Sequence, residues 1–100
     1  MASTMHTGGS AERGKATIAA YQCGKCHTIP GIRGASGVVG PPLAGVSERT
    51  YIGGNFPNTP NNLIHWIMDP QKMKPRTGMP DLGLSETQAR DAAAYLSTLK

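Results

Sequence analysis

Aromatic residues are scarce in this sequence: its 100 residues include one Trp, one Phe and three Tyr. Hydrophobic residues of all kinds make up 38%, which is below the usual share for a globular domain. The 13 Gly and 8 Pro indicate that much of the chain forms turns and loops. A chain of this length forms one domain at most, and such small domains often need a covalent link or a bound group for stability. We therefore expect something other than side chains to fill part of the interior.

Long apolar runs and basic runs are also missing. No apolar stretch approaches the roughly 20 residues that a membrane-spanning helix needs. Lys and Arg outnumber Asp and Glu by 10 to 6, but they are spread along the chain, which disfavours a nucleic-acid-binding protein. Residues 1–10 are polar and lack the apolar segment of a signal peptide. We expect them to form a disordered tail or linker before a single domain at residues 11–100.

The polar and apolar alternation of β-strands is absent as well, and the sequence predicts an all-α fold. A first helix is expected over residues 11–21, because Ser10 can accept hydrogen bonds from the free N–H groups at its start. A second, shorter helix is expected over residues 61–68, ending before the next proline. The last helix is the clearest, since Ser85 and Gln88 have the spacing of a capping box. The connecting segments are long enough to suggest loops that wrap a cofactor.

The two cysteines lie three residues apart and are followed directly by a histidine. This C-x-x-C-H pattern, formed by Cys23, Cys26 and His27, is the attachment signature of c-type haem. The spacing lets two thiols reach the two vinyl groups of one porphyrin while His27 approaches the iron. A redox-active dithiol would follow a strand in a βαβ pattern, and a zinc site would need four ligands. A plain disulfide stays open as an alternative, but the adjacent histidine favours one haem attached through both cysteines.

The second axial ligand of such an iron has several candidates. They are Met5, His6, His65, Met68, Met73 and Met79. Met79 is favoured because it lies between Gly78 and Pro80, in a loop that can approach a flat ring closely and is stiffened by the proline. A His/Met pair is a known cytochrome c ligation that raises the reduction potential. Met73 and His65 remain open as the alternatives.

At this point the sequence resembles a class I cytochrome c over residues 11–99. The resemblance depends on several motifs in the family's order: Cys23 to His27, Gly40-Pro41-Pro42-Leu43, Leu63 to Ile67 followed by Asp69-Pro70, Lys74-Pro75 through Met79-Pro80, and Leu84-Ser85 through Leu96. The haem domains fused to subunit II of bacterial haem-copper oxidases are especially similar in one combination of motifs: Trp66-Ile67, Asp69-Pro70, Lys74-Pro75 and Met79-Pro80. The resemblance implies the small cytochrome c fold, with crossing terminal helices and long loops around one haem.

The resemblance also implies roles for single residues. The carbonyl group of Pro41 would accept the Nδ1–H of His27 and so fix the ring. Leu43 would pack against the haem face. Trp66 would line the distal side, where its indole N–H needs a partner such as a haem propionate, although a plain core Trp is an equal alternative. Two further propionate donors are implied at Arg49 and Tyr51.

The terminal helices are where the sequence departs from that family. The resemblance implies that Ile18, Ala93 and Leu96 form their crossing. The family's first-helix glycine lies one residue nearer the first cysteine than Gly14 does, and we expect Tyr21 to replace an aromatic that is missing here. Gly14 should weaken the first helix by roughly 1 kcal/mol relative to Ala, unless it permits close helix packing.

The function that follows is single-electron transfer without catalytic residues, because both axial positions of the iron are filled. The expected partners are redox proteins, such as a haem-copper oxidase or another respiratory complex, and the expected location is the periplasm or the extracytoplasmic face of a bacterial membrane, for a monomeric protein. A haem enzyme or gas sensor would instead need a distal acid or base, for which only Asp81 and His65 are candidates. A dithiol module without haem is the third alternative. Positive charge expected around the haem edge comes from Lys25, Lys72, Lys74 and Arg76.

Overall fold

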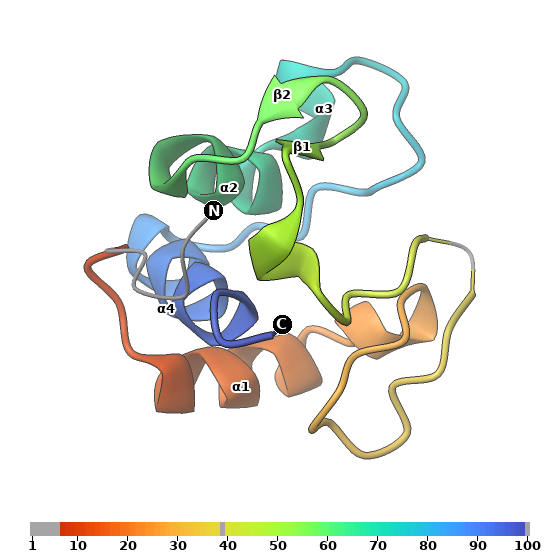
Figure 1. Ribbon diagram of the computed structural model, residues 1–100, viewed down its shortest axis with the longest axis vertical. Coiled ribbons are helices and arrows are strands. Elements are labelled where there is room, and N and C mark those ends of the chain that lie inside the picture. The colour runs from red at the N-terminus through yellow and green to blue at the C-terminus, as the bar shows by residue number, and fades with distance from the viewer. Residues whose placement is uncertain (1–6, 39, 100) are drawn as a thin grey trace.

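Four α-helices and long connecting loops make up the fold in a computed structural model, which describes residues 7–38 and 40–99 (Figure 1). The helices are α1 (Ala11–Ala20), α2 (Pro60–Met68), α3 (Pro70–Met73) and α4 (Glu86–Leu96), with single 3₁₀ turns at Cys23–Lys25 and Val46–Glu48. The only strands in the described part of the chain are β1 (Tyr51–Ile52) and β2 (Phe56–Pro57). The all-α fold class is therefore confirmed, with a minimal hairpin added to it.

The starts of the two terminal helices follow the predicted caps. The Ser10 hydroxyl accepts a hydrogen bond from the Arg13 N–H, at 3.3 Å, and α1 begins at the next residue. At α4 the Ser85 hydroxyl accepts from the Gln88 N–H at 3.1 Å, and the Gln88 side chain accepts from the Ser85 N–H at 2.9 Å. This reciprocal pair is a complete capping box, so the sequence signal alone places this helix start correctly.

Helices α1 and α4 cross in direct contact, although they come from opposite ends of the chain (Figure 1). A β-carbon at Gly14 would lie only 1.8 Å from the Asp91 carbonyl oxygen, so glycine is what permits the backbones to touch. The predicted crossing residues Ile18, Ala93 and Leu96 are all buried. The close approach therefore explains why a residue of low helix propensity stands inside α1.

A carboxylate at this crossing is also buried. The Asp91 side chain accepts hydrogen bonds from the Ser10 N–H at 2.8 Å and from the Arg13 guanidinium at 3.1 and 3.3 Å. Its hydrogen bonds to Arg13, and then to Ser10, hold the pKa of this carboxyl below its ordinary value. The start of α1 is thereby tied to the middle of α4.

Helix α2 covers the other side of α4 and contributes Leu63, Ile64 and Ile67 to the core. It begins one residue earlier than predicted, because Thr59 caps it and Pro60 fits the first turn. The predicted end before Pro70 is right, but a further helical turn, α3, follows. Pro70 is fully buried and starts this turn, which no pattern in the sequence indicated.

The hairpin between the second 3₁₀ turn and α2 corrects the expectation that the chain forms no strand. Tyr51 pairs with Pro57 and Ile52 with Phe56, in antiparallel register. Two glycines with positive φ, Gly53 and Gly54, form the turn. Two residues per strand are too few to show a polar and apolar alternation, which is why the pattern was not visible.

The segment expected as a tail has a described part that packs against α4. Residues 1–6 lie outside the described residues. Thr7 is buried, donates a hydrogen bond to the Arg90 carbonyl at 2.9 Å, and accepts one from the Arg90 guanidinium at 2.7 Å through its own carbonyl. Within residues 7–38 and 40–99, no helix has the length and apolar character needed to cross a membrane.

Candidate functional site

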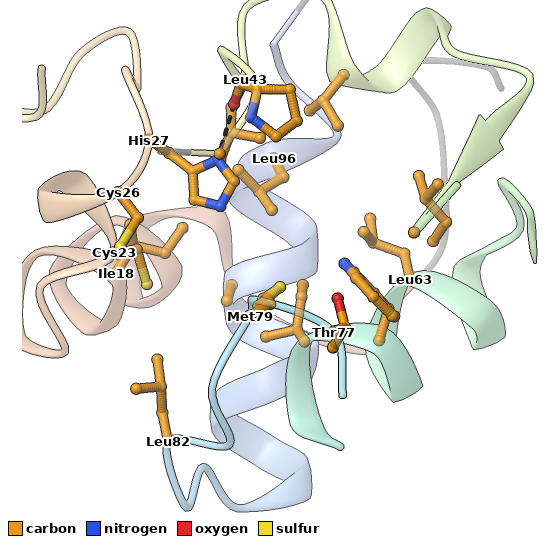
Figure 2. Close-up of a pocket in the computed structure, with 18 of the residues that line it drawn as sticks. Ile18, Cys23, Cys26, His27, Leu43, Leu63, Thr77, Met79, Leu82 and Leu96 are labelled. Atoms are coloured by element: carbon orange, nitrogen blue, oxygen red, sulfur yellow. Dashed lines mark hydrogen bonds between the residues drawn. The ribbon is translucent and has the colours of Figure 1, made fainter. Parts of the chain in front are cut away.

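A cavity of about 450 Å³ lies between the helices and the loops (Figure 2). Its walls are largely apolar and include Ile18 of α1, Leu63 of α2 and Leu96 of α4. No Asp or Glu side chain is among the described residues that line it. The thin core predicted from the composition thus corresponds to a real hollow, and its lining suits a large apolar group.

The C-x-x-C-H residues form one wall of this cavity. The chain leaves α1 through Gln22, whose φ of 59° is left-handed, and turns at once into the 3₁₀ turn Cys23–Lys25. The Cys23 carbonyl accepts from the N–H groups of both Cys26 and His27, at 3.2 and 3.1 Å. This compact turn places both free thiols and the imidazole together at the cavity.

The Cys23 thiol differs from an ordinary surface thiol. Burial raises the pKa of Cys23, the nearby Cys26 thiol raises it further, and a backbone hydrogen bond partly opposes the rise. At neutral pH the Cys23 thiol therefore stays protonated in the absence of a bound group. Because the thiolate is the reactive form, this raised pKa makes Cys23 less reactive than an exposed cysteine, while its thiol lies at the cavity within reach of a group inside it.

The His27 ring is held in one orientation. Its Nδ1 lies 2.7 Å from the Pro41 carbonyl oxygen, which can only accept, so Nδ1 carries the proton. Nε2 is then left with its lone pair available to a metal. A β-carbon at Gly40 would lie 2.3 Å from Cε1 of His27, so the absence of a side chain lets the ring rest against the backbone. The structure thus contains the Pro41 contact that the sequence resemblance implied.

Met79 reaches the cavity from the loop between α3 and α4. Figure 2 shows its side chain and the His27 ring on different walls, with Cys23 and Cys26 together on the His27 side. Of the other candidate ligands in the described residues, Met68, Met73 and His65 do not line the cavity, and His65 is exposed. The candidates Met5 and His6 lie outside the described residues.

The remaining predicted residues also border the cavity. Leu43 and Trp66 line it, and Trp66 packs against Phe56 with ring centroids 6.0 Å apart and planes 39° apart. The Trp66 indole N–H forms no hydrogen bond with residues 7–38 and 40–99. Arg49 and Tyr51 lie at the edge, where Arg49 donates to the Pro42 carbonyl and Tyr51 is 58% exposed.

Several lining residues were not predicted from the sequence. Leu82 and Leu84 close the cavity from the segment before α4, and Ile52 and Gly53 close it from the hairpin. A β-carbon at Gly53 would lie 2.9 Å from the Trp66 ring, so this glycine lets the turn rest on the indole. The one signal that could have pointed to this wall is the pair of leucines, Leu82 and Leu84, at alternate positions after Met79-Pro80.

Comparison with known families agrees with this arrangement. Residues 11–100 match the family model described as cytochrome c. The chain belongs to the cytochrome c family. It is also 34% identical over 91 residues to cytochrome c oxidase subunit 2 of Alkalihalophilus pseudofirmus, an alignment that covers 90% of this chain and 26% of that protein. The chain thus spans about a quarter of that relative's length.

Membership of this family makes the chain a haem-binding electron carrier, and the cavity fits the group that the cytochrome c family carries. Two thiols and an oriented imidazole lie on one wall, a soft thioether lies on another, and the space between them is apolar. The donors that a c-type haem requires are therefore present around a single cavity.

Proposed function

We propose that the protein is a single-electron carrier with one haem c, bound through Cys23 and Cys26 and ligated by His27 and Met79. The observation that supports this proposal is the single apolar cavity on which all four side chains converge. A bound haem would supply the ferrous/ferric couple. The chain's own contribution is to exclude water from the ring, to orient the ligands and to tune the potential.

Each proposed ligand has its own effect on the iron. The hydrogen bond from His27 to Pro41 fixes the ring plane and makes Nε2 a better donor. The thioether of Met79 is a soft donor that favours ferrous over ferric iron, so it raises the reduction potential. With His27 and Met79 both bound to the iron, no coordination position would be left for a substrate, so the haem would supply outer-sphere electron transfer.

The alternative of a haem enzyme or gas sensor has less support. It would need an acid or base next to the distal position, and the sequence offered Asp81 and His65. Both are exposed, and neither is among the described residues that line the cavity. Among the described residues, no cluster of three or more His, Cys, Asp or Glu could hold a metal ion, which also disfavours a zinc site.

The sixth ligand is tested by replacing the methionines one at a time. Met79→Ala should lower the potential, abolish the sulfur-to-iron charge-transfer band of the ferric protein, and let the ferrous protein bind carbon monoxide. Met73→Ala is the matched control, because Met73 ends α3 shortly before this loop and does not line the cavity. An exchange of these behaviours would assign the ligand to Met73, and no change in either variant would favour His65.

The covalent attachment has a separate test. Acid–acetone extraction should leave the colour with the protein, and neither Cys23 nor Cys26 should react with a thiol reagent. Release of free haem, or reaction of one thiol, would contradict attachment through both cysteines. A visible absorption spectrum of the purified protein would by itself exclude the dithiol module without haem.

The partners and the location follow from the same proposal. The relative named above is an oxidase subunit, and we propose that this chain, as a monomer, passes electrons to or from respiratory partners such as a haem-copper oxidase. Because covalent haem c is assembled outside the cytoplasm, we place the protein in the periplasm or on the extracytoplasmic face of the membrane. Four exposed cations are suited to meet an acidic partner: Lys25, Lys72, Lys74 and Arg76.

A further inference from the structure

The loop that carries Met79 has few hydrogen bonds to the rest of the protein. Within residues 7–38 and 40–99, the loop of residues 76–81 forms one backbone–backbone hydrogen bond. It joins the Thr77 N–H to the carbonyl of Lys74, which lies just before the loop, at 3.1 Å. Among the described residues, Gln71 is the partner in every other hydrogen bond of this loop. Hydrogen bonds to Gln71 thus hold the backbone of this loop on both sides of Met79.

Gln71 contacts this loop on both sides of Met79. Its amide Nε2 donates to the carbonyl oxygens of Thr77 and Met79, at 2.6 and 2.9 Å. Its Oε1 accepts from the Arg76 N–H at 3.1 Å, and its backbone N–H donates to the Asp81 carboxylate at 3.1 Å. Both the amide donor group and the carbonyl acceptor of the Gln71 side chain thus form hydrogen bonds with the same short loop.

The two ends of this contact are constrained differently. We call the contacts of Gln71 with residues 76–81 the clamp. Because Gln71 follows Pro70, which is fully buried, the clamp extends from a fixed part of the core. Arg76, by contrast, has a φ of 68°, a left-handed conformation that is unfavourable for a residue with a side chain. Such a bend persists only if the surroundings hold it, and the hydrogen bond from its N–H to Gln71 is the contact that does so.

We propose that Gln71 is a positioning residue that keeps the Met79 loop closed and so sets how often the thioether leaves the iron. The proposal builds on the ligation by Met79 proposed above. Gln71 itself does not line the cavity. It acts through the backbone of the loop, and its loss should increase loop opening while the fold stays intact.

Two substitutions separate the parts of this clamp. Gln71→Glu keeps an oxygen for the Arg76 N–H but removes the two donors to the carbonyls of Thr77 and Met79. Gln71→Ala removes all three side-chain bonds. Ser85→Ala is the matched control, since it weakens the α4 cap and lowers overall stability without contacting the loop or the cavity.

The main measurement is the rate at which the ferric holoprotein binds imidazole, which requires Met79 to leave first. Gln71→Glu and Gln71→Ala should each bind imidazole on the order of tenfold faster, the effect expected from losing one or two hydrogen bonds. Ser85→Ala should bind at the wild-type rate. A Gln71→Glu rate within twofold of wild type would overturn the proposal, and so would an equal acceleration in Ser85→Ala.

A second measurement does not depend on ligation by Met79. Hydrogen exchange of the Arg76 amide should accelerate about tenfold in Gln71→Ala, which removes its acceptor, and should stay at the wild-type rate in the Ser85→Ala control. If the wild-type ferric protein lacked the sulfur-to-iron band, the proposed ligation would fail, and this exchange experiment would still decide the clamp. Unchanged exchange in Gln71→Ala would overturn it.

Discussion

The contact between α1 and α4 can be tested by placing a methyl group at Gly14. In Gly14→Ala the new β-carbon would lie 1.8 Å from the carbonyl oxygen and 2.4 Å from the carbonyl carbon of Asp91. Non-bonded carbons reach their best separation at about 3.5–4.0 Å, so the helices would have to separate by more than about 1 Å. Both opposing atoms belong to the backbone, so no change of rotamer can relieve the clash.

The magnitude follows from two opposing effects. Overpacking of this kind lowers the free energy of unfolding by about 1–3 kcal/mol, and a backbone clash belongs at the upper end of this range. The higher helix propensity of Ala raises the free energy of unfolding by about 1 kcal/mol relative to Gly. We therefore expect a net loss of about 2 kcal/mol, or roughly 8–16 °C in the melting temperature of the holoprotein. Because Ile18 and Leu96 line the cavity from these helices, its lining should loosen as well.

Chemical and thermal unfolding of the holoprotein, followed by circular dichroism, would measure this loss. Ala16→Gly is the control, since Ala16 is exposed on the same helix and should lose only the propensity term of about 1 kcal/mol. If α1 responded to propensity alone, Gly14→Ala would gain about as much as Ala16→Gly loses. A Gly14→Ala protein more stable than wild type would refute the close contact of the two helices.

Three further predictions follow from the described contacts. Because Arg13 and the Ser10 N–H hold the pKa of Asp91 below its ordinary value, stability should fall as the pH drops below about 4, and Asp91→Asn should flatten that fall in acid titrations of unfolding. Arg76→Gly should raise the free energy of unfolding by up to about 1 kcal/mol in denaturant titrations, because it relieves the left-handed φ; a loss would contradict this. Electron-transfer rates to an acidic partner should fall with added salt, and exchanging Lys72 for Glu should slow them; rates indifferent to both changes would exclude charge steering.

Local signals in the sequence predicted much of this structure. The helix starts at Ser10 and Ser85 depend on residues within one turn, so a short stretch of sequence is enough to place them. The same holds for Cys23, Cys26 and His27, whose spacing specifies their shared wall. These features could be predicted because the interacting groups are neighbours in the chain.

Contacts between distant segments were harder to predict. The hairpin has two residues in each strand, and it forms because Gly53 and Gly54 turn the chain and the turn rests on Trp66. The role of Gln71 depends on how the following loop folds back, and a lone glutamine after a proline carries no signal of that. The burial of Thr7 likewise depends on Arg90, at the other end of the chain.

The crossing of α1 with α4 also bears on the kinetics of folding. The two helices are separated by most of the chain, so their contact closes a loop that contains both His27 and Met79. Closing a long loop has an entropic barrier that must be overcome before the contact stabilises anything, and such topologies fold slowly. The same contact should make unfolding cooperative, because separation of the helices opens the closed loop and frees both walls of the cavity at once. The order of events during maturation would then matter. A group attached at the wall that carries Cys23 and Cys26, next to α1, would be bound before the wall that carries Met79 closes over it.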